Sequence, residues 1–179
     1  MTPNASNNLI RYKAFQRKDL DSIPQIQTLP YDERLTMKAV SAVLPFRVNQ
    51  YVIDELIDWT NVPEDPIFQM TFPQRGMLDP IQLTELTDLI TRNAPDDIFK
   101  ATVRRIQNGL NPHPAGQVEL NVPMVNGDPL PGMQHKYRET VLFFPSQGQT
   151  CHAYCTYCFR WPQFVGLDEL KFASNEAEG

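Results

Sequence analysis

The feature that most restricts the fold of this chain is its proline content. Sixteen of the 179 residues are proline and only eight are glycine, so proline is nearly twice as frequent as usual and glycine is scarcer than average. Proline fixes the backbone φ angle and cannot donate a hydrogen bond, and it therefore interrupts helices and central strands. We expect short elements joined by rigid connections, within one domain or slightly more.

The region 31–112 is predicted to be helical. Asp79-Pro80 is an N-cap followed by proline at the first helical position. Pro95-Asp96-Asp97 places acidic residues in a first turn, where they suit the helix dipole. The segment 61–77 contains three prolines, and we expect it to be a loop. Apolar residues at helical spacing predict helices over 32–44, 49–59, 79–90 and 95–109.

Residues 1–30 are expected to form a flexible N-terminal arm, either a tail or a segment that wraps around the domain. The arm is polar and is broken by Pro24 and Pro30. It begins with a basic stretch that precedes the first acidic residue, Asp19, and we interpret this stretch as a mobile basic tail. The basic residues are Arg11, Lys13, Arg17 and Lys18.

Charge and hydropathy exclude two classes of partner. The chain has 16 Lys and Arg against 21 Asp and Glu, a net charge of −5, whereas proteins that bind nucleic acid are normally basic. The longest apolar run, 141–144, is far too short for a membrane helix, and the first twenty residues contain no apolar core of a signal peptide. We predict no nucleic-acid partner, no membrane association and a cytoplasmic location, where thiols stay reduced.

The sequence pattern changes after residue 112. Residues 118–122 alternate between apolar and polar, as in a half-buried strand. Residues 126–129, Asn-Gly-Asp-Pro, are typical of a turn. Residues 140–144 are a continuous β-branched and aromatic run that ends at Pro145. Such a run is typical of a strand covered on both faces, as in parallel α/β sheets and barrels.

Three cysteines follow this strand and are the strongest chemical signal in the chain. Cys151, Cys155 and Cys158 have the spacing CxxxCxxC, and there is no other cysteine. An odd number at such close spacing cannot form a disulfide framework. A structural zinc site needs four ligands, so a histidine would have to join the three thiolates. A [4Fe–4S] cluster held by three thiolates would instead leave one iron free to bind a small molecule.

The three histidines are weak candidates for a fourth ligand. His152 lies between the first two cysteines, where simultaneous ligation with its neighbour is awkward. His113 and His135 belong to other segments, and we expect them to form only local hydrogen bonds.

The cysteine loop resembles the signature of the radical S-adenosylmethionine enzymes. In that signature CxxxCxxC follows a buried strand and has an aromatic residue, here Tyr157, before the last cysteine. The surrounding sequence is similar to the lysine 2,3-aminomutase family, including its helical leader, and the resemblance covers roughly residues 50–170. The stretches that carry it are 72–74, 113–116, 140–144, 159–160 and 164–166.

The resemblance implies a set of cofactors and roles. Cys151, Cys155 and Cys158 would ligate a [4Fe–4S] cluster, and Tyr157 would lie against the adenine of S-adenosylmethionine. An electron from a donor protein would cleave S-adenosylmethionine, and the resulting radical would take a hydrogen atom from an amino acid substrate. In the family, pyridoxal phosphate then carries the amino group between adjacent carbons. Arg160 would pair with the substrate carboxylate, a bidentate geometry that suits a guanidinium.

The sequence also departs from the family pattern. Trp161-Pro162-Gln163 follow Arg160 where the family has consecutive arginines, so the resemblance does not specify lysine as the substrate. The family's lysine for pyridoxal phosphate and its glycine-acid strand both lie further downstream. A full barrel of this type needs about 250 residues. We therefore expect an N-terminal fragment that is inactive alone.

The predicted fold class is α/β. A flexible arm (1–30) precedes a helical leader (31–112), and 113–179 form the first strand and cysteine loop of a partial, truncated (β/α) radical SAM barrel. The predicted function is that of a radical SAM protein of the aminomutase type. Two alternatives remain open: a non-enzymatic interaction module stapled by zinc through the three cysteines and one histidine, and a helical scaffold with no cofactor.

Overall fold

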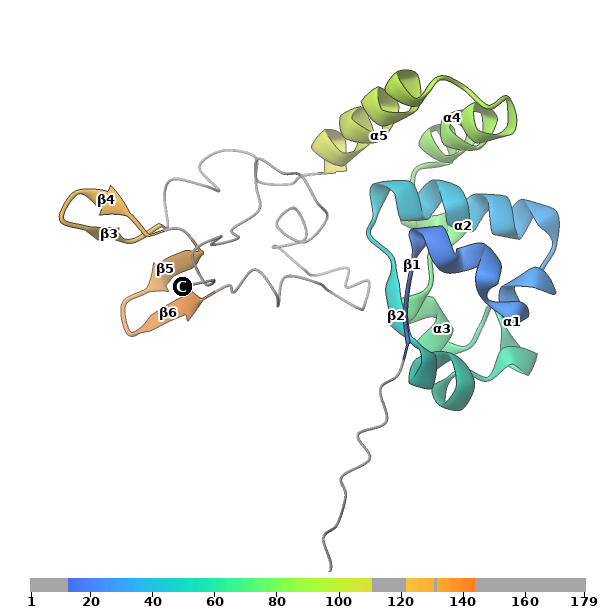
Figure 1. Ribbon diagram of the computed structural model, residues 1–179, viewed down its shortest axis with the longest axis horizontal. Helices are drawn as coiled ribbons and strands as arrows, with labels where there is room; N and C mark the ends of the chain where they lie inside the picture. The colour runs from blue at the N-terminus through green and yellow to red at the C-terminus, as the bar shows by residue number, and fades with distance from the viewer. Residues whose placement is uncertain (1–12, 111–121, 131, 144–179) are drawn as a thin grey trace, which may run out of the picture.

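The computed structural model describes residues 13–110, 122–130 and 132–143 (Figure 1). Helices and short turns of helix make up most of the first of these ranges, and small antiparallel strand pairs make up the rest. The content is therefore mixed α/β, as predicted. The cysteine loop lies outside the described residues, and within them every strand pairing is antiparallel.

The N-terminal segment is part of the fold from residue 14 onward. It forms strand β1 (Ala14–Gln16), a 3-10 helix η1 (Arg17–Ser22) and a short helix α1 (Pro24–Gln27). Leu20, Ile23 and Ile26 are at most 2% exposed. The prediction of a flexible arm is therefore wrong for this part of 1–30. The apolar residues are few, but they are spaced so that each reaches the core from a different short turn.

Helix α2 (Tyr31–Val43) confirms the prediction over 32–44. It is followed by strand β2 (Arg47–Asn49), which pairs antiparallel with β1 so that Phe15 lies opposite Val48. The helix predicted over 49–59 is wrong, because Asn49 ends a strand instead. Its side-chain oxygen accepts a hydrogen bond from Val52 N at 2.9 Å, which starts a π-helical turn, η2 (Val52–Leu56).

The segment predicted to be a loop, 61–77, contains a helix. After the 3-10 turn η3 (Trp59–Asn61), helix α3 runs over Pro66–Thr71, and a further 3-10 turn, η4, spans Arg75–Met77. The cause is a second Asp-Pro start signal, because the Asp65 carboxylate accepts a hydrogen bond from Phe68 N at 2.7 Å and Pro66 takes the first helical position.

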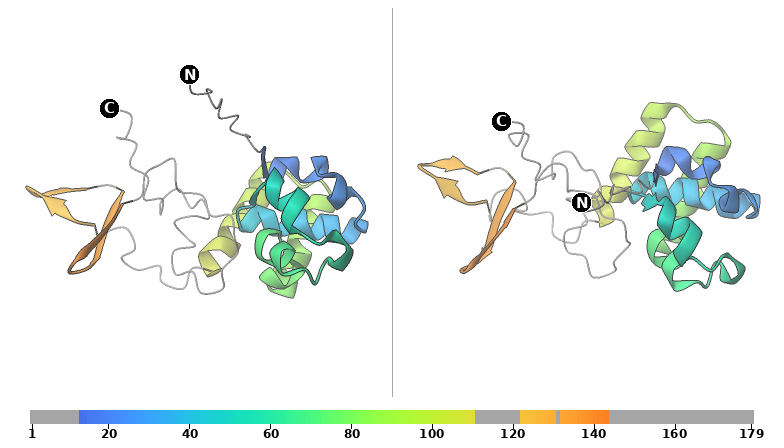
Figure 2. Two further views of the ribbon diagram at one scale, coloured as in Figure 1. Left: turned by 90° about the horizontal axis from the view of Figure 1, so that it is seen from below. Right: turned by 60° about the horizontal axis from the view of Figure 1, so that its bottom comes forward.

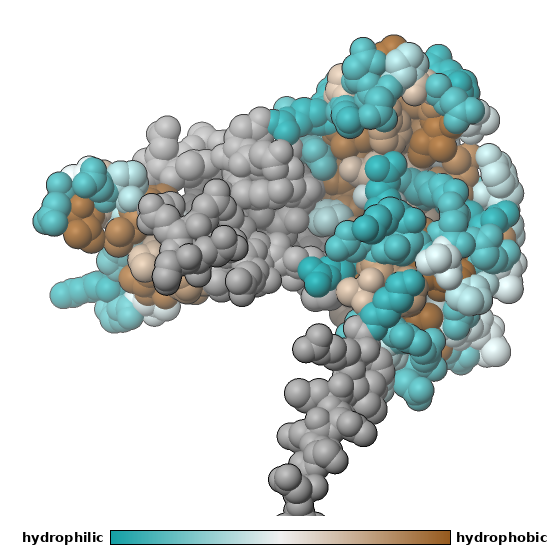
Figure 3. All heavy atoms as spheres, in the orientation of Figure 1, coloured by the Kyte–Doolittle hydropathy of each residue, from teal (hydrophilic) through white to brown (hydrophobic). Residues whose placement is uncertain are grey.

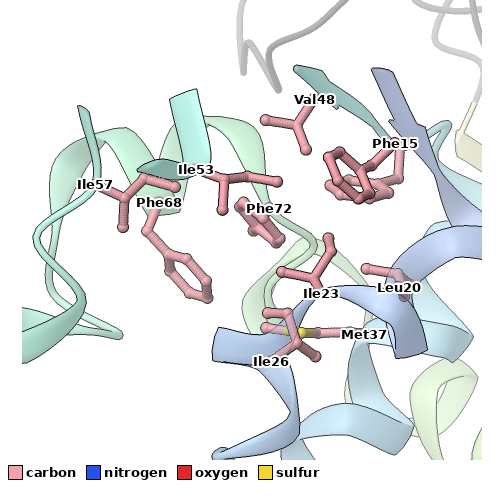
Figure 4. Close-up of a cluster of buried hydrophobic side chains, with 11 residues drawn as sticks. Phe15, Leu20, Ile23, Ile26, Met37, Val48, Ile53, Ile57, Phe68 and Phe72 are labelled. Carbon is pink, nitrogen blue, oxygen red and sulfur yellow. The ribbon is translucent and has the colours of Figure 1, made fainter. Parts of the chain in front are cut away.

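A first hydrophobic core joins the N-terminal turns to α3 (Figure 4). Phe68 and Phe72 stack with ring centroids 5.0 Å apart, and Trp59 meets both rings edge-on at 5.7 Å. The indole nitrogen of Trp59 donates to the carbonyl of Ile53 at 2.8 Å. Trp59 is therefore a packing residue, as predicted. The buried members are Phe15, Leu20, Ile23, Ile26, Met37, Phe46, Val48, Ile53, Ile57, Phe68 and Phe72.

A second core lies on the other side of α2. Helices α4 (Pro80–Thr91) and α5 (Asp96–Leu110) pack against α2, and both confirm the sequence prediction, including the Asp79 N-cap, which accepts from Ile81 N at 2.8 Å. Figure 2 shows the surrounding elements gathered around α2, which contacts η1, η4, α4 and α5. The buried members of this core are Ala39, Val40, Val43, Leu78, Leu83, Leu86 and Ile106.

Two hairpins make up the described part of the chain after residue 121. Strands β3 (Met124–Val125) and β4 (Asp128–Pro129) are joined by Asn126 and Gly127, both at positive φ, which confirms the predicted turn. Strands β5 (Met133–Tyr137) and β6 (Thr140–Phe143) pair antiparallel with a bulge.

The predicted strand over 140–144 is confirmed, but its predicted environment is not. β6 has β5 as an antiparallel neighbour, and Val141 and Phe143 are 50% and 56% exposed. Hydrophobic surface is visible at the hairpins in Figure 3, whereas the helical region presents mixed polar and apolar surface. In the described residues, β6 is therefore not a strand covered on both faces within a parallel sheet.

Candidate functional site

The site residues predicted from the sequence lie outside the described part of the chain. Its last described residue is Phe143. The structure therefore neither brings these side chains together nor separates them, and their roles stay predictions. The residues concerned are Cys151, Cys155, Tyr157, Cys158 and Arg160, together with His113 and His152.

The hairpin that precedes the cysteines has two polar side chains of note. His135 is exposed, and its Nε2 lies 3.4 Å from the carbonyl oxygen of Arg138, which is the local hydrogen bond predicted for it. Gln134 is only 6% exposed, and its Oε1 has no hydrogen-bond partner among the described residues. A buried amide oxygen without a partner is unfavourable, so Gln134 marks the face of β5 on which a donor would be stabilising.

Residues 13–110, 122–130 and 132–143 contain no group of three or more His, Cys, Asp or Glu side chains that could hold a metal ion. The same residues do contain a pocket of about 620 Å³ that is open to solvent, which we call the basic pocket. It lies between η1, α2, the turn after α2 and the end of α4. Its lining consists of Gln16, Arg17, Lys18, Asp21, Lys38, Ser41, Pro45, Phe46 and Ile90.

The polar wall of the basic pocket carries three cations and one acid. Lys38 Nζ is 2.7 Å from the Asp21 carboxylate, which leaves that pair neutral. Arg17 and Lys18 have no carboxylate in ion-pair contact among the described residues. The pocket therefore presents about two positive charges, although the chain as a whole is acidic.

Arg17 is held at the edge of the pocket by a ring and a distant acid. Its guanidinium carbon lies 5.4 Å from the centroid of Phe99 on α5. Neighbouring atoms displace water from the guanidinium and lower the pKa of Arg17, while attraction to Asp96 acts in the opposite direction. Asp96 itself is 2.7 Å from Lys100, so its charge is shared. Arg17 remains a cation, because an arginine pKa begins above 12.

The apolar wall of the pocket comes from both cores. Phe46 is 4% exposed and belongs to the first core, whereas Ile90 packs against the second. Pro45 lies between α2 and β2 and completes this wall. The position of the pocket at the junction of two cores gives it a firm floor.

Sequence reasoning missed this pocket although its basic residues were noticed. Arg17 and Lys18 belong to the stretch interpreted as a mobile tail, and the structure places them in η1 instead. The signal that indicates an ordered segment is the apolar series Leu20, Ile23 and Ile26, which follows directly.

Comparison of the chain with protein-family models, with characterised proteins and with solved structures found no match. In the part of the chain that the structure describes, no helix is long and apolar enough to cross a membrane.

Proposed function

We propose that this chain is the N-terminal part of a radical S-adenosylmethionine protein of the aminomutase type. The observation that carries the proposal is the CxxxCxxC spacing of Cys151, Cys155 and Cys158. Three thiolates fit an iron–sulfur cluster with one iron open to a small molecule, and they are one ligand short of a structural zinc site. The proposal takes this segment as the start of a partial (β/α) barrel.

The sequence around the cysteines supports the proposal. The loop follows a strand, and the structure forms β6 over Thr140–Phe143, a few residues before Cys151. Helices α2, α4 and α5 agree with a helical leader upstream. The antiparallel hairpin β5–β6 does not reproduce the parallel pairing of a barrel strand, so the support from β6 lies in its position in the chain and not in its partners.

The proposed roles follow from the chemistry of each side chain. The three thiolates would hold the cluster, which when bound supplies one electron to S-adenosylmethionine. Tyr157 would offer its ring to the adenine, and Arg160 would hold the carboxylate of an amino acid substrate through two parallel hydrogen bonds. For the complete protein, the proposal includes pyridoxal phosphate and a one-electron donor protein.

The proposal is tested by reconstituting the full chain with iron and sulfide without oxygen. We expect a brown protein with about four irons per chain. The Cys155→Ala variant should lose the cluster, whereas Thr156→Ala, which changes a residue of the same loop without removing a thiol, should keep it. A colourless protein that binds one zinc, with chelator-induced unfolding of the C-terminal segment, would replace the proposal with the zinc-stapled module. A chain that binds neither metal would be a helical scaffold.

Catalytic activity needs a separate measurement. We expect the reconstituted chain alone not to cleave S-adenosylmethionine, because one strand and one loop cannot supply a site built from several barrel strands. Formation of 5′-deoxyadenosine by the reduced chain, measured by chromatography, would show that the expectation of an inactive fragment is wrong.

A further inference from the structure

The basic pocket is distinctive because its charge opposes that of the chain. Within its lining, Lys38 and Asp21 neutralise each other at 2.7 Å. Arg17 and Lys18 remain without a carboxylate in ion-pair contact among the described residues. Two such cations facing one hollow attract an anion more strongly than isolated surface lysines do, since the walls exclude part of the solvent.

Arg17 is positioned to donate hydrogen bonds to that anion. The contact with the Phe99 ring fixes one face of the guanidinium. The ring makes no demand on the N–H donors at the edge of the guanidinium plane, which therefore stay available for a bidentate contact. The acid that attracts Arg17 from outside the pocket, Asp96, is already engaged by Lys100 at 2.7 Å.

The opposite wall suits an apolar body attached to the anion. Pro45, Phe46 and Ile90 line it, and the volume of about 620 Å³ lies within the range of small-molecule sites. Inorganic anions alone would leave this wall in contact with water. Two uncompensated positive charges match a phosphate monoester, which carries about −1.5 to −2 at neutral pH, better than they match a monocarboxylate.

We propose that the basic pocket binds a small organic phosphate, with Arg17 and Lys18 on the phosphate group and Phe46 and Ile90 against the organic body. This site uses none of the cysteines and does not depend on the proposed radical chemistry. It adds a binding site within the helical region to the function proposed for the cysteine loop.

The first test is titration calorimetry of the full chain with phenyl phosphate. We expect saturable binding that weakens as salt is raised, and roughly tenfold weaker binding of inorganic phosphate and of benzoate, which lack the apolar body or the second charge. Equal binding of benzoate and phenyl phosphate would overturn the assignment to a phosphate. Equal binding of inorganic phosphate would overturn the role of the apolar wall.

Matched variants assign the binding to this pocket. Arg17→Gln combined with Lys18→Gln should weaken phenyl phosphate roughly tenfold or more. Lys13→Gln also removes one positive charge near the N-terminus but lies outside the lining, and it should change the affinity little. Unchanged affinity in the double variant, or an equal loss in Lys13→Gln, would overturn the proposal.

Two further variants separate the pocket from other causes. Lys18→Gln alone changes an exposed side chain and should retain the circular dichroism of the parent while losing part of the affinity, so a folding defect in the double variant cannot decide the result. Cys155→Ala should bind phenyl phosphate like the parent. Loss of binding in Cys155→Ala would place the ligand at the cysteine loop and overturn the proposal.

Discussion

Two Asp-Pro helix starts in the same region differ in burial, and this difference gives a sharp stability prediction. Asp65 is 5% exposed and uses both carboxylate oxygens: Oδ1 accepts from Phe68 N at 2.7 Å and Oδ2 accepts from Asp58 N at 3.2 Å. Asp79 is exposed, and its Oδ1 accepts from Ile81 N at 2.8 Å. An Asp→Asn change keeps one acceptor oxygen and replaces the other with an NH₂ donor.

The expected losses follow from those contacts. In Asp65→Asn the new NH₂ group faces the N–H of Asp58 in a buried place, and the lost bond to a charged acceptor should lower the unfolding free energy by about 2 kcal/mol. In Asp65→Ala the cap is lost as well, for a total of about 3 kcal/mol. Asp79→Asn keeps the cap and should stay within about 0.5 kcal/mol, because Asn and Asp cap equally well.

Urea unfolding measures these losses in a Trp161→Phe background, in which Trp59 is the remaining tryptophan. Trp59 contacts Phe68 and Phe72, so its fluorescence reports the core beside Asp65. Far-UV circular dichroism should give the same midpoints. Equal losses in Asp65→Asn and Asp79→Asn would refute the reasoning, because the buried second acceptor would then contribute nothing.

Three further predictions concern the cores and the pH response. Phe72→Ala removes a side chain with no exposed surface and should lower the unfolding free energy by about 3–5 kcal/mol; a loss below about 1 kcal/mol in urea unfolding would contradict the packing described. Gln107→Leu removes the bond from Nε2 to the carbonyl of Val43 at 2.9 Å and should lower it by about 1–3 kcal/mol, because the carbonyl at the end of α2 loses its donor; an unchanged midpoint would contradict that role. The pKa of Asp96 lies below its ordinary value of 3.8, because Lys100 donates to it and attracts it. Its stabilisation is therefore present above pH 3.8 and is lost as pH falls through the lowered folded pKa. Asp96→Asn should make stability less sensitive to pH in that window, as measured by urea midpoints on either side of it, and an unchanged slope would contradict the ion pair.

The helices that the sequence predicted correctly are those with several agreeing signals. Helix α4 has a cap, a proline at its first position and a leucine stripe, and the structure forms it over Pro80–Thr91. The helix at Pro66–Thr71 has the same Asp-Pro start. It was missed because three prolines in 61–77 suggested a loop and because six residues are too few to show a helical period.

Tertiary contacts decided the elements that local patterns could not. Asn49 lies opposite Ala14, 35 positions earlier in the chain, so the apolar series after it could not continue as one helix. The basic pocket depends on the same long-range packing, since Lys18 and Ile90 meet only when η1 and α4 both pack on α2. Sequence spacing carries no information about such a meeting. The cysteine spacing, by contrast, is a local signal that is read directly from the chain.

The most direct test of the proposed function is electron paramagnetic resonance of the reconstituted chain after anaerobic reduction. An iron that lacks a protein ligand should bind S-adenosylmethionine, so we expect the signal of the reduced cluster to change when S-adenosylmethionine is added and not when methionine or adenosine is added alone. A cluster signal that S-adenosylmethionine leaves unchanged, or a protein that contains zinc and gives no signal, would contradict the proposal that Cys151, Cys155 and Cys158 hold a cluster with one open iron.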